Sequence, residues 1–236
     1  MRIGGLQKLT LLDYPGLTAC TIFLSGCNLR CPYCHNGLLV VPGKLSRAVS
    51  ETELFAFLKK RQGLLDGVCV TGGEPLLSDE ILPFLFRIKQ LGYQVKLDTN
   101  GTNPARLKEV IREGLADYVA MDIKNSKERY PITVGREDFS IKPVEQSVDI
   151  LREGKVEYEF RTTVVKGLHD RESIGAIGDW ISGAQRYFLQ NFRESEDLIA
   201  ELSGIRIPMG SFKREELEEF IHILQSKQIP AVIRGE

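Results

Sequence analysis

Short apolar segments, typical of strands, alternate with amphipathic segments, typical of helices, along almost the whole chain of 236 residues. Repetition of strand, helix and strand produces parallel strands joined by right-handed crossovers. The pattern contains about six such units and one closing strand, which is fewer than the eight of a complete barrel. We therefore expect one α/β domain, residues 1–236, built as a partial, open parallel β/α barrel. The predicted strands are residues 20–25, 67–71, 94–98, 117–122, 157–165, 186–191 and 231–234.

Several helix boundaries are marked by capping residues. Residues 50–53 have the sequence of a capping box, and Asn103 precedes a proline, which is favoured at the first position of a helix. Asp170 begins another helix, whereas Pro83 indicates that the helix after the second predicted strand begins later than residue 78. Residues 124–144 show no clear periodicity, so we expect an irregular loop there.

Charge and apolar content limit the partners and the compartment that we expect. The formal net charge is −1, so the overall balance favours neither nucleic acid nor an anionic membrane as a partner. No apolar run approaches the roughly 20 residues that span a bilayer, and residues 1–10 lack the apolar core of a secretion signal. We therefore expect a cytoplasmic protein, in which clustered cysteines stay reduced and bind metal rather than form disulfides.

Three cysteines, Cys27, Cys31 and Cys34, lie within eight residues directly after the first predicted strand. Three thiolates without a fourth can hold three corners of a cubane iron–sulfur cluster. The fourth iron then stays open for a ligand that is not protein, and an open metal position is typical of catalysis. Cys20 and Cys69 lie within predicted strands and are expected to be core thiols.

Other polar residues follow the remaining predicted strands. Because the carboxyl ends of parallel strands meet at one rim of a β/α fold, we expect these residues to converge on a common site. Glycines that lack a Cβ let the main chain approach a ligand closely, and a lysine beyond a buried strand can bind a carboxylate. The residues concerned are Gly72, Gly73, Glu74, Asp98, Thr99, Asn100, Asp122, Lys124, Gln190 and Asn191.

The pattern Cys-x3-Cys-x2-Cys, followed one unit later by Gly-Gly-Glu-Pro at 72–75, resembles the radical S-adenosylmethionine (SAM) enzymes. Cys-Pro-Tyr-Cys-His-Asn at 31–36 and Asp-Thr-Asn-Gly at 98–101 are similar to motifs of the activating enzymes of glycyl-radical enzymes. Leu-Leu-Asp-Tyr-Pro-Gly at 11–16 most resembles the activating proteins of anaerobic ribonucleoside-triphosphate reductase.

The resemblance implies a site for each cofactor. Cys27, Cys31 and Cys34 would bind a [4Fe–4S] cluster, and SAM would bind the open iron through its amino and carboxylate groups. Residues implied to contact SAM are Tyr33 and His35 near the adenine, Gly72, Gly73 and Glu74 near the ammonium, and Lys124 near the carboxylate. Asp98, Thr99 and Asp122 can together hold a monovalent cation beside that carboxylate, since hard cations prefer oxygen ligands.

The implied reaction begins when the reduced cluster passes one electron to SAM, which yields methionine and a 5′-deoxyadenosyl radical. For an activating enzyme, that radical removes the Cα hydrogen of one glycine on a partner glycyl-radical enzyme. Asp13, in a turn expected at the barrel mouth, would contact the glycine loop of the partner. A flavodoxin- or ferredoxin-type reductant would supply the electron.

Other interpretations remain open from the sequence. The three cysteines could bind a structural zinc ion with His35 or Cys69 as the fourth ligand, which would make the chain a non-catalytic, zinc-stabilised binding module. A compact radical SAM enzyme could instead act on a small molecule, as a deazapurine synthase does. Residues 72–75 could be a tight turn in which Glu74 is merely solvated, Asp98 and Asn100 could only shape a loop, and Lys124 could be an ordinary surface residue.

Overall fold

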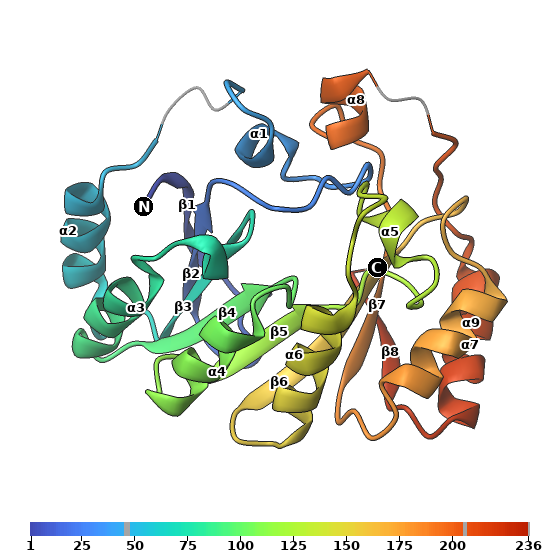
Figure 1. Ribbon diagram of the computed structural model, residues 1–236. Helices are drawn as coiled ribbons and strands as arrows, with labels where there is room; N and C mark the ends of the chain where they lie inside the picture. Colours follow the sequence, from blue (N-terminus) through green and yellow to red (C-terminus); the bar gives the residue numbers. More distant parts are fainter. Residues whose placement is uncertain (45–47, 205–206, 236) are drawn as a thin grey trace.

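The computed structural model describes residues 1–44, 48–204 and 207–235, and its strands form one curved sheet (Figure 1). Along the sheet the strands lie in chain order from β1 to β8. β1 pairs antiparallel with β2, and every later neighbour pairs parallel. The predicted α/β fold with a partial, open sheet of parallel strands is therefore confirmed.

All seven predicted strands are present, and each ends within one residue of its predicted position. The accuracy is greatest where the signal is strongest: β2, β3 and β5 are short runs of residues that are nearly all buried. The strands are β1 (Ile3–Thr10), β2 (Ala19–Leu24), β3 (Gly67–Gly72), β4 (Gln94–Thr99), β5 (Tyr118–Asp122), β6 (Glu157–Val164), β7 (Tyr187–Asn191) and β8 (Ala231–Arg234).

β1 was not predicted from the sequence pattern. Its eight residues include the adjacent glycines Gly4 and Gly5, and only Ile3 and Thr10 are buried. It lies at the edge of the sheet, where an antiparallel strand can be half exposed to solvent. The short apolar run that identifies the parallel strands is consequently absent here.

The predicted helix starts are confirmed. Ser50 accepts from the Glu53 amide in a capping box, Asn103 accepts from the Arg106 amide, and Asp170 caps the helix that follows it. The helices are α1 (Gly37–Val40), α2 (Glu51–Arg61), α3 (Ile81–Gln90), α4 (Pro104–Arg112), α5 (Tyr130–Thr133), α6 (Lys142–Arg152), α7 (Arg171–Trp180), α8 (Ile199–Ser203) and α9 (Arg214–Ser226), with the 3₁₀ helix η1 at Pro75–Leu77.

The expectation of an irregular loop over residues 124–144 was wrong in part. The segment contains the short helix α5 and the first residues of α6. Tyr130 anchors α5 because its ring is fully buried and stacks on Phe139 with ring centroids 5.4 Å apart. The segment therefore follows the barrel surface as a packed element.

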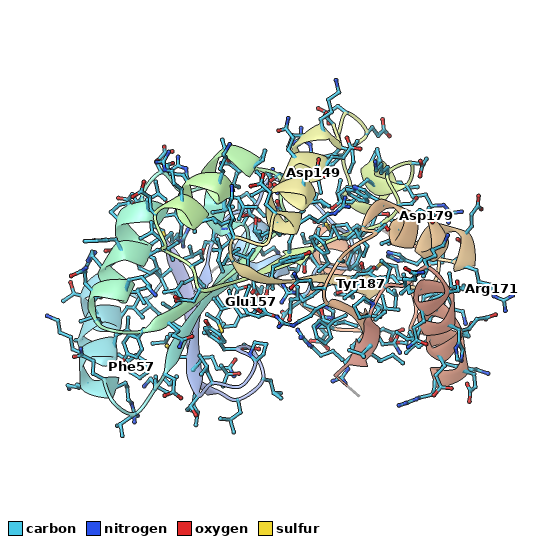
Figure 2. All side chains as sticks on the ribbon, turned by 90° about the horizontal axis from the view of Figure 1, so that it is seen from below. Phe57, Asp149, Glu157, Arg171, Asp179 and Tyr187 are labelled. Carbon is cyan, nitrogen blue, oxygen red and sulfur yellow. The ribbon has the colours of Figure 1, made fainter. Side chains whose placement is uncertain are left out.

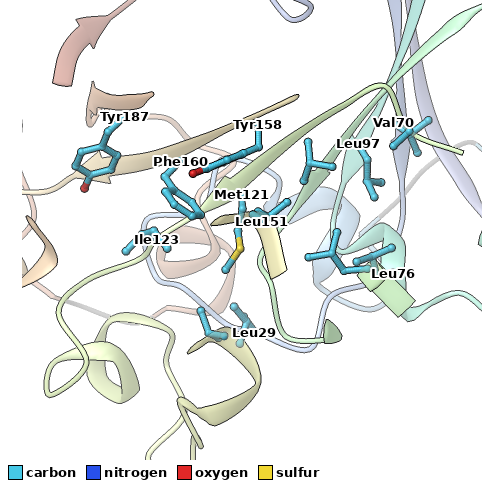
Figure 3. Packing of buried hydrophobic residues seen from close by; sticks show 14 of the residues in the cluster. Leu29, Val70, Leu76, Leu97, Met121, Ile123, Leu151, Tyr158, Phe160 and Tyr187 are labelled. Atoms are coloured by element: carbon cyan, nitrogen blue, oxygen red, sulfur yellow. The ribbon is translucent and has the colours of Figure 1, made fainter. Parts of the chain in front are cut away.

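The apolar core lies between the sheet and the helices that surround it (Figure 2). Figure 3 shows part of this layer, in which Leu97 of β4, Met121 of β5 and Phe160 of β6 pack beside Leu151 of α6. Successive residues of a strand point to opposite faces, so the residues next to these project into the barrel. Within the described residues no helix has the length and apolarity needed to cross a membrane.

Candidate active site

A cavity of about 250 Å³ opens at the carboxyl ends of the parallel strands. Five of the lining residues, the three cysteines among them, come from the loop after β2, and others come from the ends of β3, β4, β5, β6 and β7. Most of the polar residues predicted at the rim thus meet in one pocket, although Glu74 and Asn191 are not among its lining residues. The predicted residues that line it are Cys27, Cys31, Cys34, Gly72, Gly73, Asp98, Thr99, Asn100, Asp122, Lys124 and Gln190.

The three thiols face this pocket in a largely buried setting. Burial raises the pKa of Cys27 to about 11 and that of Cys31 to about 12, and burial also raises the pKa of Cys34, although Lys124 opposes each shift. The Leu29 amide donates to Cys27 Sγ at 3.4 Å, and Asn100 Nδ2 lies 3.7 Å from the same sulfur. A metal group bound here would displace the thiol protons and supply the positive charge that stabilises thiolates.

The donor set fits a cluster with one open position. Among the described residues that line the pocket, no imidazole and no fourth thiol is present, and no three His, Cys, Asp or Glu side chains form a ready site for a single ion. His35 is exposed, and its Nε2 donates to the Arg193 carbonyl at 2.7 Å. Cys69 is buried within β3. Neither residue is therefore positioned as the fourth ligand of a closed zinc site.

The double glycine holds the pocket wall close to the cysteine loop. Gly72 has a φ of +118°, and a Cβ on it would lie 2.3 Å from the Leu24 carbonyl oxygen. A Cβ on Gly73 would lie only 1.8 Å from the Gly26 carbonyl oxygen. Any side chain at these positions would push the ends of β2 and β3 apart. Both glycines are therefore required by contacts within the chain, in addition to any close approach of a ligand.

Glu74 is buried and is not among the lining residues. Its carboxylate accepts from the amides of Leu76 at 3.0 Å and Asn100 at 2.6 Å, and from the Thr99 hydroxyl at 2.8 Å. Burial raises the pKa of Glu74 to about 7 despite these donors. Glu74 ties the loop after β3 to the loop after β4, and its predicted contact with an ammonium group stays a prediction.

A chain of alternating charges crosses the pocket floor. Arg161 donates to Asp98 at 3.1 Å and to Asp122 at 3.0 Å, Lys124 donates to Asp122 at 2.8 Å, and Lys96 pairs with Asp98. Burial alone would raise the pKa of both carboxyl groups, but these cations outweigh it and hold both below their usual range. Both carboxylates thus already contact protein cations, and a monovalent cation at this place stays a prediction.

Sequence reasoning missed two polar residues, Arg161 and Asn36, which line the pocket. Asn100 and Gln190, which also line it, were among the residues expected at the rim. Asn36 Nδ2 donates to the Gly72 carbonyl at 2.6 Å, which joins the cysteine loop to the glycine turn. The signal for Arg161 was a charged residue within an otherwise buried strand, since such a charge is stable only with partners.

Tyr33 and His35, which the resemblance assigns to the adenine, do not line the pocket among the described residues. Tyr33 is buried in the apolar core, and its hydroxyl has no hydrogen-bond partner among the described residues. The His35 ring lies 5.9 Å from that of Phe192, just after β7. Their contact with a nucleoside stays a prediction.

The position of Asp13 corrects the expectation of a turn at the barrel mouth. Asp13 accepts from the Thr21 hydroxyl at 2.5 Å, and the neighbouring Tyr14 packs against Gly67 and Tyr118, which begin β3 and β5. The turn therefore lies toward the amino ends of the strands, at the opposite end from the cysteines. The physical reason is the buried Tyr14 ring, which holds the turn at the amino ends of the strands.

Comparison with known proteins agrees with this geometry. Residues 21–177 match the family model of the radical SAM superfamily. A Methanocaldococcus jannaschii protein whose name describes a glycyl-radical enzyme activating enzyme is 33% identical, over 98% of this chain and 95% of that protein. A pyruvate formate-lyase-activating enzyme of Clostridium pasteurianum is 26% identical, over 93% of this chain and 96% of its own.

Two further comparisons concern a small-molecule enzyme and the fold. A 7-carboxy-7-deazaguanine synthase of Koribacter versatilis is 38% identical, but over only 39% of each chain. A radical SAM methyltransferase of Sphaerobacter thermophilus has a similar structure, with a TM-score of 0.69, 18% identity, and coverage of 96% of this chain and 68% of that one. A radical SAM fold implies a [4Fe–4S] cluster and SAM as cofactors. The chain belongs to the radical SAM superfamily and is homologous to the activating enzymes of glycyl-radical enzymes.

Proposed function

We propose that this protein activates a glycyl-radical enzyme, and that its partner is an anaerobic ribonucleoside-triphosphate reductase. The observation that carries the proposal is a pocket with three cysteines and no fourth protein ligand among its described lining residues. The full-length similarity to an activating enzyme supports the class of substrate. The motif at residues 11–16 supports the particular partner.

In this proposal Cys27, Cys31 and Cys34 hold the cluster. When bound, the cluster supplies the electron that cleaves SAM into methionine and the 5′-deoxyadenosyl radical, which takes a hydrogen atom from the glycine Cα and leaves as 5′-deoxyadenosine. Lys124, fixed by Asp122, offers its ammonium to the SAM carboxylate. The pocket walls position the reacting groups, which is the contribution of protein to cofactor chemistry.

The remaining parts of the proposal follow from the same reaction. A flavodoxin- or ferredoxin-type protein supplies single electrons, and a monovalent cation can bind beside Asp98, Thr99 and Asp122 if SAM binding displaces Arg161. Tyr33 and His35 contact the adenine, and Asp13 contacts the partner. The cytoplasm, where thiols stay reduced, is the compartment that this chemistry requires.

The test is anaerobic reconstitution with iron and sulfide, reduction, and addition of SAM. We expect a stable [4Fe–4S] cluster and formation of 5′-deoxyadenosine, followed by a glycyl radical in the electron paramagnetic resonance (EPR) spectrum when the reductase is added. Stoichiometric zinc without iron in the purified protein would disprove the cluster. The reductase and pyruvate formate-lyase are tested side by side as partners, and cleavage of SAM without a radical on the reductase would disprove the proposed partner.

A small-molecule substrate is the second candidate, favoured by the local similarity to a deazaguanine synthase. That similarity covers less than half of the chain, whereas the similarity to activating enzymes covers nearly all of it. Formation of a deazaguanine product by the reconstituted protein, with no radical on any glycyl-radical enzyme, would favour this candidate.

A further inference from the structure

The main chain between Cys27 and Cys31 contacts a segment about a hundred residues away in the sequence, residues 134–136. The Arg30 amide donates to the Val134 carbonyl at 2.9 Å. Arg136 Nη1 donates to the Asn28 carbonyl at 3.3 Å. Gly135, with a φ of +66°, lies so close that a Cβ on it would be 2.4 Å from the Arg30 carbonyl oxygen.

Arg30 adds contacts from within the loop itself. Its Nη1 donates to the carbonyls of Cys27 at 2.6 Å and Leu29 at 2.7 Å. Three successive carbonyls, those of Cys27, Asn28 and Leu29, thus accept from arginine guanidinium groups. Hydrogen bonds from a charged donor are the stronger kind, so the orientation of three consecutive peptide groups is fixed.

One of these peptide groups reaches a candidate cluster ligand. The Asn28 carbonyl and the Leu29 amide belong to the same planar trans peptide, so they point in opposite directions. Arg136 binds the carbonyl end, and the amide end donates to Cys27 Sγ at 3.4 Å. The guanidinium therefore fixes the direction of the N–H group that meets the sulfur.

The segment that supplies these contacts is itself anchored. It follows α5, whose Tyr130 is fully buried, and the Tyr130 hydroxyl accepts from the Lys124 amide at 3.2 Å. The Val134 amide donates to the Tyr130 carbonyl, and Arg136 also pairs with Asp138 at 3.1 Å. Residues 134–136 can thus act as a rigid support.

We propose that residues 134–136 and Arg30 form a brace that holds the cysteine loop in its cluster-binding conformation and directs the Leu29 N–H to the Cys27 sulfur. The brace rests on the proposed cluster and adds positioning residues to it. Groups around metal ligands orient those ligands, and hydrogen bonds to sulfur help to set the reduction potential of an iron–sulfur cluster. Removal of the brace therefore loosens the cluster and shifts its midpoint potential to a more negative value.

The sharpest test compares Gly135→Ala with Gly114→Ala in the reconstituted protein. Gly114 has nearly the same backbone conformation, with a φ of +63°, but a Cβ there meets nothing within 4 Å. Both variants carry the same strain of a left-handed residue, and only Gly135→Ala pushes the brace from the loop. We expect Gly135→Ala to lose iron to a chelator at least about tenfold faster, in line with other groups that support metal ligands, and to have a more negative midpoint in an EPR-monitored titration.

Equal iron loss and equal midpoints in the two alanine variants would overturn the brace. Arg136→Gln is the second variant, since it removes only the exposed guanidinium, and we expect the same direction of change in midpoint. If the wild-type protein takes up no cluster, the proposed function fails by itself. The brace is then tested by amide hydrogen exchange in the metal-free protein. Gly135→Ala should lose protection of the amides of residues 28–30, and Gly114→Ala should keep it. Unchanged protection in Gly135→Ala would overturn the brace.

Discussion

Replacement of Arg161 by methionine tests whether the charged chain in the pocket floor stabilises the fold. Arg161 bridges Asp98 and Asp122 at 3.1 and 3.0 Å, and all three side chains are largely buried, with exposed fractions of 14%, 14% and 29%. Breaking a buried ion pair by removing one partner costs about 3–5 kcal/mol. Lys96 and Lys124 remain as partners of the two carboxylates, so we expect a loss of about 3 kcal/mol, at the lower end of this range.

For a chain of this length, that loss lowers the melting temperature by about 6–12 °C. Thermal and urea unfolding followed by circular dichroism measure it, and Arg112→Met is the control, because Arg112 is 69% exposed and its pairs are worth less than about 1 kcal/mol. The stability of the wild type should also fall as the pH drops below about 4, since Asp98 and Asp122 have pKa values below those of the unfolded chain. This acid dependence should be weaker in Arg161→Met. A variant as stable as the wild type, with the same acid dependence, would refute the reasoning.

Three further predictions concern single residues, two of them in the site and one, His169, buried elsewhere in the fold. Cys31→Ala should leave the barrel folded by circular dichroism but abolish formation of 5′-deoxyadenosine; unchanged turnover would remove Cys31 from the ligand set. Gly73→Ala should lower stability by about 1–3 kcal/mol, as overpacking does, because its Cβ would lie 1.8 Å from the Gly26 carbonyl oxygen. The control is Gly175→Ala, which has room for a Cβ and should keep the stability of the wild type. Equal melting temperatures of the two variants would contradict the Gly73 contact. His169 should stay neutral down to about pH 4 in an NMR titration, because burial lowers its pKa to about 4. Its contribution to stability is therefore complete above about pH 6.5 and is lost as the pH falls to about 4. Titration of His169 near pH 6.5 would contradict the burial.

The sequence was sufficient for the parts of the fold in which one local signal dominates. β3 and β5 are runs of buried residues, and no neighbouring element had to be known to identify them. The site residues at the strand ends followed from topology alone, because parallel strands must bring their carboxyl ends to one rim. This is why Cys27, Gly72 and Lys124 meet in one pocket although they are far apart in the chain.

Features that depend on long-range contacts could not be predicted in this way. Arg161 is part of the site because Asp98 and Asp122 of two other strands face it, and the sequence does not say which side chains meet across a barrel. The sequence around Gly135 contains no motif that marks it, and only its contact with Arg30 in the folded chain gives it a role. α6, which was not predicted, differs from these features because it carries local signals: Pro143 lies in its first turn, and its buried residues recur at helical spacing.

The separation of Asp13 from the pocket constrains how a polypeptide partner could be bound. The Asp13 carboxylate accepts a hydrogen bond from Thr21 of β2. In the register of the sheet, Thr21 lies opposite Cys69 of β3, Cys69 opposite Lys96 of β4, and Lys96 opposite Tyr118 of β5. Asp122, at the pocket, is four residues further along β5, and at about 3.3 Å per residue this is a distance of about 13 Å. One glycine cannot contact Asp13 and react in the pocket at the same time. If Asp13 recognises the partner, it therefore does so through a segment several residues away from the reacting glycine, and its role is docking rather than chemistry.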